Sequence, residues 1–148
     1  MNPDELAGVV DLFGALSRGE LREAIDELAY KRGVEVEDGA IEAAVATFAL
    51  VPFDDPERLA VGPTAFPELP EGGEDLPHIL DIERRAVDRE RVVTAAEERF
   101  REEAALAVAA GNEERQEALR DVSYDLEAWG TGSLESLRTR LDAALSLE

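Results

Sequence analysis

The sequence has no cysteine, one histidine and one lysine, and aromatic residues fill only 5% of its 148 positions. The lack of cysteine excludes disulfides, thiol nucleophiles and Cys-ligated metal sites. No stretch of 18 residues is apolar throughout, so the sequence predicts no membrane-spanning helix. Asp4 and Glu5 stand where a secretory signal would carry positive charge. We therefore expect a cytoplasmic protein with no membrane partner.

The single histidine limits the catalytic chemistry that the chain can offer. His78 follows Pro77 at an expected helix start, and none of the serines lies in a Gly-x-Ser-x-Gly elbow. Asp75 and His78 supply too few ligands for a zinc site, and glycine-rich phosphate loops are missing. We expect no catalytic residue, no cofactor and no metal ion. An enzymatic alternative would have to use His78 with a serine or a carboxylate.

Four carboxylates follow one another at intervals of four residues: Glu113, Glu117, Asp121 and Asp125. On a helix this spacing places them on one face, where divalent cations find oxygen ligands. The segment lacks the glycine turn of a calcium-binding loop, and Leu126 marks a different face that we expect to be buried. We interpret the row as a solvated surface.

Acidic residues outnumber basic ones by 35 to 15, which gives a formal net charge of −20 at pH 7. The excess is even: residues 1–70 carry 15 acids and 5 bases and residues 71–148 carry 20 and 10, so each part has a net charge of −10. An even excess with a single lysine resembles the proteins of salt-accumulating haloarchaea. At molar salt the Debye length falls to about 3 Å, which removes most of the repulsion between the charges.

The spacing of apolar residues predicts three helices within the first fifty residues. The first is capped by Asn2 or Asp4. The second begins at Ser17, which opens a Ser-x-x-Glu capping box, and ends at Gly33. The third follows Asp38. Short turns join the three helices, so they must pack on one another.

A β-hairpin is expected directly after the third helix. The apolar run 49–53 contains a proline, which restricts it to an edge strand or a strand end. The segment 54–57 has turn composition, and 59–61 returns as the second strand. The order helix, helix, helix, hairpin over residues 4–62 resembles the winged helix-turn-helix fold, with the Gly33 region as the turn and 54–57 as the wing tip. Together with the charge pattern, it resembles an uncharacterised family of haloarchaeal winged-helix-like proteins, and this resemblance assigns no known site.

The winged-helix resemblance implies that the helix after Asp38 would be a recognition helix. That helix contains no basic residue, and the wing is acidic apart from Arg58. Because affinity for DNA comes largely from Lys and Arg at phosphates, DNA binding is not favoured. The basic residues that would contact DNA in this alternative are Lys31, Arg32, Arg58, Arg84 and Arg85.

Glycine and proline are concentrated in residues 63–76, which we interpret as a linker or strap between a winged-helix-like module (1–62) and an antiparallel helical segment (77–148). A heptad-like apolar seam runs through the start of this segment. Its positions include Ile79, Ile82, Val93, Ala96 and Phe100. The sequence leaves open whether one helix spans 77–110 or a new helix begins at Asp88. It also leaves open whether the seam is covered by the same chain or by a second copy in a homodimer.

The sequence therefore predicts a mainly α-helical protein with an N-terminal winged-helix-like module of three helices and a hairpin, followed by antiparallel helices. We expect a halophilic, non-enzymatic protein that acts through protein–protein contact, as a dimeric adaptor or a regulatory factor. The alternative is a winged-helix transcriptional regulator that binds DNA.

Overall fold

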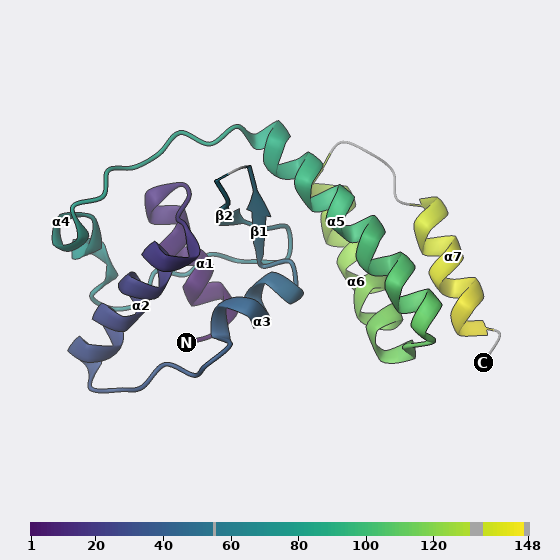
Figure 1. Cartoon of the computed structure of the whole chain (residues 1–148), viewed down its shortest axis with the longest axis horizontal. Coiled ribbons are helices and arrows are strands. Elements are labelled where there is room, and N and C mark those ends of the chain that lie inside the picture. The colour runs from purple at the N-terminus through teal and green to yellow at the C-terminus, as the bar shows by residue number, and fades with distance from the viewer. Residues whose placement is uncertain (55, 131–134, 147–148) are drawn as a thin grey trace. The chain divides into compact units, whose positions relative to one another are not determined.

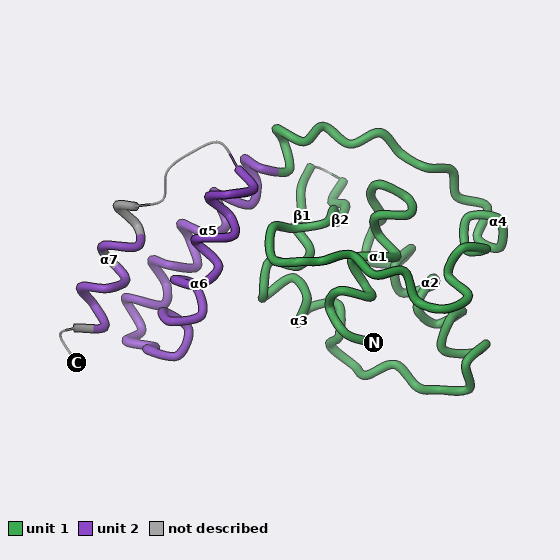
Figure 2. Tube along the Cα trace, turned by 180° about the vertical axis from the view of Figure 1, so that it is seen from behind, with its two compact units in different colours: residues 1–92 green, residues 93–148 purple. Residues whose placement is uncertain are grey.

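The computed structural model describes residues 1–54, 56–130 and 135–146 (Figure 1). The elements in chain order are α1 (Pro3–Phe13), α2 (Arg18–Arg32), α3 (Ala40–Ala46), β1 (Leu50–Phe53), β2 (Arg58–Val61), the 3-10 helix η1 (Gly73–Asp75), α4 (Leu76–Leu80), α5 (Arg89–Ala110), α6 (Glu113–Trp129) and α7 (Glu135–Ser146). The expectation of a mainly helical protein with a small hairpin is confirmed. Figure 2 shows its two compact units, Met1–Val92 and Val93–Glu148.

The first two helices begin at capping boxes. Asn2, rather than Asp4, caps α1: its side chain accepts a hydrogen bond from the Glu5 amide at 2.8 Å, and the Glu5 carboxylate accepts one from the Asn2 amide at 3.2 Å. Helix α2 has the box predicted at Ser17 and ends at Gly33, whose φ of 66° suits glycine. Each box satisfies two amides that the first helical turn leaves without an acceptor.

The hairpin forms as predicted, and a third segment joins it. Strands β1 and β2 pair antiparallel, and Leu50 lies opposite Val61. The residue between α1 and α2, Leu16, adds an isolated bridge to Leu59: the Leu59 amide donates to the Leu16 carbonyl at 2.7 Å and the Leu16 amide donates back at 3.1 Å. Helix α3 begins after Gly39 instead of Asp38. Phe48 follows the helix with a φ of 65° and is fully buried.

Helix α1 lies at the centre of unit 1 and packs against α2, α3 and β2. Its apolar stripe and that of α2 are buried as their spacing predicts. The largest fully buried side chains of the unit are Leu6, Phe13, Leu16, Leu21, Ile25, Leu28, Phe48, Leu50, Leu59 and Leu76. A buried side chain of this size contributes about 1.5–3 kcal/mol, so the α1 stripe holds the helices and the hairpin together.

Residues 63–76, predicted as a linker or strap, belong to unit 1 and run along α1. The Glu68 amide donates to the Asp4 carbonyl at 3.0 Å, and the Phe66 amide donates to the Asp4 carboxylate at 3.0 Å. The side chain of Phe66 itself is 82% exposed, so its backbone, and not its ring, attaches the strap to α1 at this point. Leu76, by contrast, is fully buried in the core of unit 1.

The continuous helix over 77–110 does not form, and the alternative with a break at Asp88 is confirmed. Helix α4 ends at Asp81, which has a φ of 53°, and the chain is non-helical until α5 begins after Asp88. The Asp88 carboxylate accepts a hydrogen bond from the Glu90 amide at 3.1 Å.

The predicted seam is consequently divided between two elements. Val93, Ala96 and Phe100 are buried within unit 2, whereas Ile79 is 40% exposed on α4 and Ile82 is half-buried after it. The three α5 positions are thus covered by the same chain.

Unit 2 consists of α5 from Val93 onward, α6 and α7. Asn112 caps α6 by accepting a hydrogen bond from the Arg115 amide at 3.0 Å. Leu119, Leu126 and Leu141 are buried between the helices. Ser133 precedes the last helix in the sequence, and serine favours a helix cap, but it lies outside the described residues.

Candidate functional site

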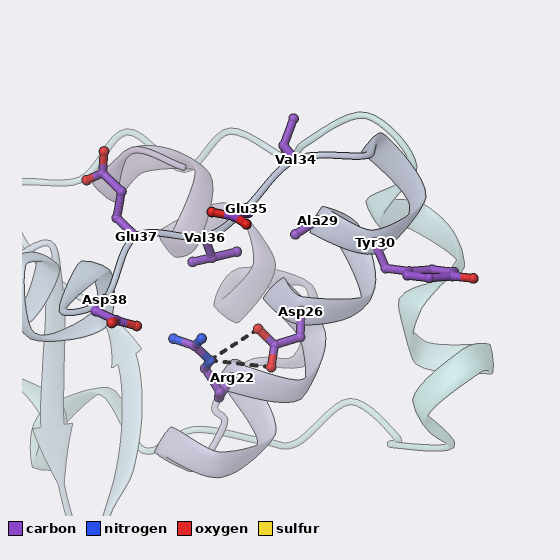
Figure 3. Close-up of a pocket in the computed structure, with 9 residues that line it drawn as sticks. All are labelled: Arg22, Asp26, Ala29, Tyr30, Val34, Glu35, Val36, Glu37 and Asp38. Carbon is purple, nitrogen blue, oxygen red and sulfur yellow. Dashed lines mark hydrogen bonds and ion pairs between the residues drawn. The ribbon is translucent and has the colours of Figure 1, made fainter.

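An open pocket of about 570 Å³ lies on unit 1 between α2 and the loop that joins α2 to α3 (Figure 3). Nine residues line it: Arg22, Asp26, Ala29, Tyr30, Val34, Glu35, Val36, Glu37 and Asp38. Ala29 is 6% exposed and Val36 packs against the hydrophobic core. These two residues give the pocket an apolar floor.

The wall of the pocket is acidic. Arg22 Nε lies 3.1 Å from Asp26 Oδ1, one helical turn away, and this pair has no net charge. The side chains of Glu35, Glu37 and Asp38 make no ion pair or hydrogen bond with any described residue. One arginine against four carboxylates leaves the pocket with a formal net charge of −3.

Two apolar side chains extend into solvent at the rim of the pocket. Tyr30 is 85% exposed and Val34 is 54% exposed. Figure 3 shows them projecting outward from the end of α2 and from the loop. An aromatic and an aliphatic side chain presented together beside a pocket are a common feature of binding surfaces.

Acidic side chains of α3 and of the turn before β2 bind the arginine at the start of α2. Arg18, at the start of α2, pairs with Glu42 of α3, and its Nε lies 2.8 Å from Glu57 Oε1 next to β2. Helix α3 itself has no lysine or arginine. Arg18 is therefore neutralised by acidic side chains of α3 and the hairpin turn, whereas Arg58, at the start of β2, makes no ion pair with the described residues.

Arg84, a candidate DNA contact, is bound to main-chain oxygens. Its guanidinium donates to the carbonyl oxygens of Asp11 and Leu12 at 2.6 and 3.2 Å, at the end of α1. The next amide along the chain, that of Arg85, donates to the Phe13 carbonyl at 2.8 Å. Carbonyls at a helix C-terminus lack intrahelical donors, and a cation there also interacts favourably with the helix dipole. Arg84 thus has a structural role.

Arg85, a second candidate, forms a two-pronged ion pair with Glu20 at 2.6 and 2.7 Å and also donates to the Ala15 carbonyl. The hydrogen bond from Arg85 is the main cause that lowers the pKa of Glu20 from 4.5 to about 2; partial burial opposes the shift, and the Ser17 amide adds to it. The same hydrogen bond raises the pKa of Arg85. Arg85 therefore ties the segment before α5 to the start of α2.

The other three candidate DNA contacts are at the surface, on two elements. Lys31 and Arg32 are exposed in the last turn of α2, and Arg32 Nη1 lies 3.6 Å from Glu5 Oε2. Arg58 is exposed at the start of β2. Lys31 and Arg58 make no ion pair with the described residues. The five candidates are thus spread over α2, β2 and the segment between α4 and α5.

The residues considered for catalysis or metal binding do not lie together in the fold. His78 and Asp75 are both exposed, on α4 and η1. The carboxylate row from Glu113 to Asp125 is exposed along α6. Among the described residues, no three His, Asp or Glu side chains are placed to share a metal ion.

A family model matches residues 4–146, which is nearly the whole chain, and its description is a family of unknown function, DUF7109. The chain belongs to the DUF7109 family. No curated protein and no solved structure matches it.

In this DUF7109 protein, no helix of the described part of the chain has both the length and the apolar character to cross a bilayer. Sequence reasoning missed the pocket beside α2. The signal for it was the segment 34–38, where two valines alternate with carboxylates between two helices. Only the fold shows that Arg22 and Asp26 of α2 line the same hollow as the loop, with Tyr30 at its rim.

Proposed function

We propose that this DUF7109 protein is a non-enzymatic, cytoplasmic protein of a halophile and acts through contact with other proteins, as a dimeric adaptor or a regulatory factor. The observation that carries the proposal is the charge of α3, which holds Glu42 and no basic residue. Arg18, which reaches α3, is paired with Glu42 and Glu57. The carboxylates of α3 and its neighbours repel the phosphates of nucleic acids. This repulsion favours contact with a protein as the use of this surface.

The order of elements in unit 1 supports a winged-helix arrangement. Three helices precede the hairpin, and the bridge between Leu16 and Leu59 joins the α1–α2 connection to it. In this interpretation α3 takes the place of the recognition helix, and the turn between β1 and β2 is the wing. A docking helix followed by a hairpin offers a shaped surface to a protein as well as to a DNA groove.

DNA binding remains the second candidate because Lys31 and Arg58 are exposed and make no ion pair with the described residues. Each phosphate that a protein neutralises contributes about −0.9 to the slope of log K against log salt. Two such cations give a shallow slope and weak binding, in contrast to the six to ten phosphate contacts of strong DNA binders.

A titration of labelled DNA fragments in KCl between about 0.2 and 2 M tests the two candidates, since salt weakens phosphate contacts steeply. We expect no saturable, sequence-dependent binding. The control is Arg101→Glu, at an exposed position of α5. Saturable binding would replace our proposal with the DNA-binding alternative if Arg58→Glu abolishes it and Arg101→Glu leaves it intact.

The dimeric form of the proposal is tested separately by light scattering coupled to size-exclusion chromatography in high salt. We expect the mass of two chains. Because Val93, Ala96 and Phe100 are already buried within unit 2, a second copy must be bound by other residues. A single-chain mass at every concentration would rule out the dimer while leaving a monomeric adaptor.

A further inference from the structure

The pocket beside α2 combines an apolar floor and two exposed apolar side chains at its rim with carboxylates that form no ion pair among the described residues. In several other places, acids are paired with arginine, as in Glu20 with Arg85 and Glu103 with Arg115. The pocket carboxylates of Glu35, Glu37 and Asp38 have no such partner among the described residues. Unpaired charge gathered in a hollow is available to a ligand of opposite charge.

The apolar residues show that charge alone does not describe the surface. Tyr30 and Val34 expose most of their side chains beside the unpaired carboxylates, and Ala29 and Val36 form the floor. Apolar contact survives at salt concentrations that screen ion pairs, because salt shortens the range of charge interactions without weakening apolar burial. The tyrosine ring also offers a face to a guanidinium or ammonium group.

These features narrow the occupant to one class. Small-molecule pockets are mostly apolar and enclose their ligand, whereas this one is open and five of its nine lining residues are charged. No metal site is formed by the described residues. A nucleic acid and a second copy of this chain, with its net charge of −20, are both negatively charged. What fits is a chain segment with positive charge and apolar side chains.

We infer that the pocket lined by α2 and the α2–α3 loop binds an arginine- or lysine-bearing segment of a partner protein. The basic side chains reach Glu35, Glu37 and Asp38, and an adjacent apolar side chain packs on Tyr30 and Val34. This inference rests on the proposed function, because it names the chemistry of the partner that the adaptor contacts.

Fluorescence anisotropy of a labelled peptide, GRLRGRLRGS, with the full chain tests the inference. We expect saturable one-to-one binding. The triple variant Glu35→Gln/Glu37→Gln/Asp38→Asn should weaken it at least about tenfold, the equivalent of about 1.4 kcal/mol. Tyr30→Ser should weaken it several-fold, and a peptide with glycine in place of both leucines should bind less well.

The matched control is the triple variant Glu117→Gln/Asp121→Asn/Asp125→Asn on α6. It removes the same three negative charges from exposed positions outside the pocket. We expect its affinity to stay within about twofold of the original. Equal weakening by the two triple variants would show attraction to net charge alone and would overturn the inference, provided that far-UV circular dichroism shows both to be folded.

Two further outcomes would also overturn the inference. One is peptide binding that does not saturate. The other is displacement of the peptide by spermidine at equal affinity, since this would assign the pocket to a small polycation. Failure of the inference is distinguishable from failure of the proposed function. If the protein binds neither the peptide nor DNA, only the assignment of the pocket is wrong. If the protein binds DNA saturably, the proposed function is wrong, whether or not the peptide binds.

Discussion

Glu20 shows how one side chain serves a local and a distant partner. Within α2 its carboxylate accepts a hydrogen bond from the Ser17 amide at 2.9 Å, which completes the capping box. Across the fold it accepts two from Arg85, 65 residues away. The first contact could be predicted from the Ser-x-x-Glu spacing. The second depends on where the chain places the segment after α4, and no spacing rule reaches that far.

The Glu20–Arg85 pair should make stability depend on acidity. The pKa of Glu20 is about 2 in the folded protein and 4.5 in the absence of these contacts, so the unfolded chain binds more protons between these values and stability rises with pH. Glu20→Gln should cost about 1–2 kcal/mol at neutral pH, allowing for solvent screening. The difference from the original protein should vanish as pH falls from 4.5 to about 2.

Urea unfolding at several pH values measures this difference. Glu23→Gln, an exposed neighbour on α2, is the control and should change stability little at any pH. A cost of Glu20→Gln that stays constant down to pH 2 would contradict the ion pair as its source.

Gln116 is a buried polar residue whose hydrogen bonding is incomplete. Its Nε2 donates to the Ala107 carbonyl at 3.1 Å, but its Oε1 is buried without a donor. The Ala107 carbonyl also accepts from the Asn112 amide, so it keeps a partner if Gln116 is replaced. Gln116→Met should therefore leave stability unchanged or raise it by up to about 1 kcal/mol in urea unfolding. A loss above about 1 kcal/mol would contradict this account of the site.

At the scale of elements, the close approach of the strap to α1 depends on one glycine. A Cβ at Gly8 would lie 2.2 Å from the Glu68 carbonyl oxygen. The hydrogen bond from the Glu68 amide to Asp4 holds the strap at this distance. The glycines and prolines of residues 63–76 predicted a linker or strap. Only the packing shows that this segment belongs to unit 1.

Two helical glycines form a matched pair for testing this contact. Gly19 in α2 has nothing nearer to an added Cβ than the Ser17 Oγ at 4.0 Å. Gly19→Ala should stabilise the protein by about 0.5–1 kcal/mol through helix propensity. Gly8→Ala gains the same propensity but should destabilise by about 2 kcal/mol or more, because the backbone of the strap must move. Thermal unfolding of both variants measures the contrast, and equal shifts would contradict the packing of the strap.

The break between α4 and α5 follows from tertiary contacts as well as from local preference. Asp88 is a suitable residue for starting a helix, and the sequence left this alternative open. The continuous helix is prevented by Arg84 and Arg85, whose hydrogen bonds hold the preceding segment along the end of α1. The apolar spacing that suggested one seam therefore serves two separate cores.

At the scale of the whole molecule, the carboxylates lie at the surface, and no aspartate or glutamate is fully buried among the described side chains. Ion pairs among the described residues, most of them partly exposed, compensate some of the charge, but each such pair contributes only about 0–1 kcal/mol. The uncompensated charges repel one another more strongly as the screening length grows.

We therefore expect folding to depend on salt. Below about 0.2 M salt, where the screening length exceeds roughly 7 Å, the protein should lose its far-UV helical signal and regain it when KCl is restored. The α6 triple variant reduces the net negative charge from −20 to −17. The salt concentration at which half of its helical signal is lost should therefore be lower than that of the original protein. A helical signal that is unchanged in dilute buffer would contradict the interpretation of the acidic surface as an adaptation to brine.

The sequence by itself determined α1, α2, the capping box of α2 and the hairpin, because these depend on residues a few positions apart. It left the cap of α1 open and placed the start of α3 one residue early. It also determined the charged, cysteine-free surface, since composition requires no fold. The tertiary structure decided the place of the strap, the arginines bound to α1 and α2, and the pocket that α2 forms with the loop bearing Glu35 and Asp38. Those features join residues that are distant along the chain or that belong to different elements, and only the packing of α1 against its neighbours sets the distances between them.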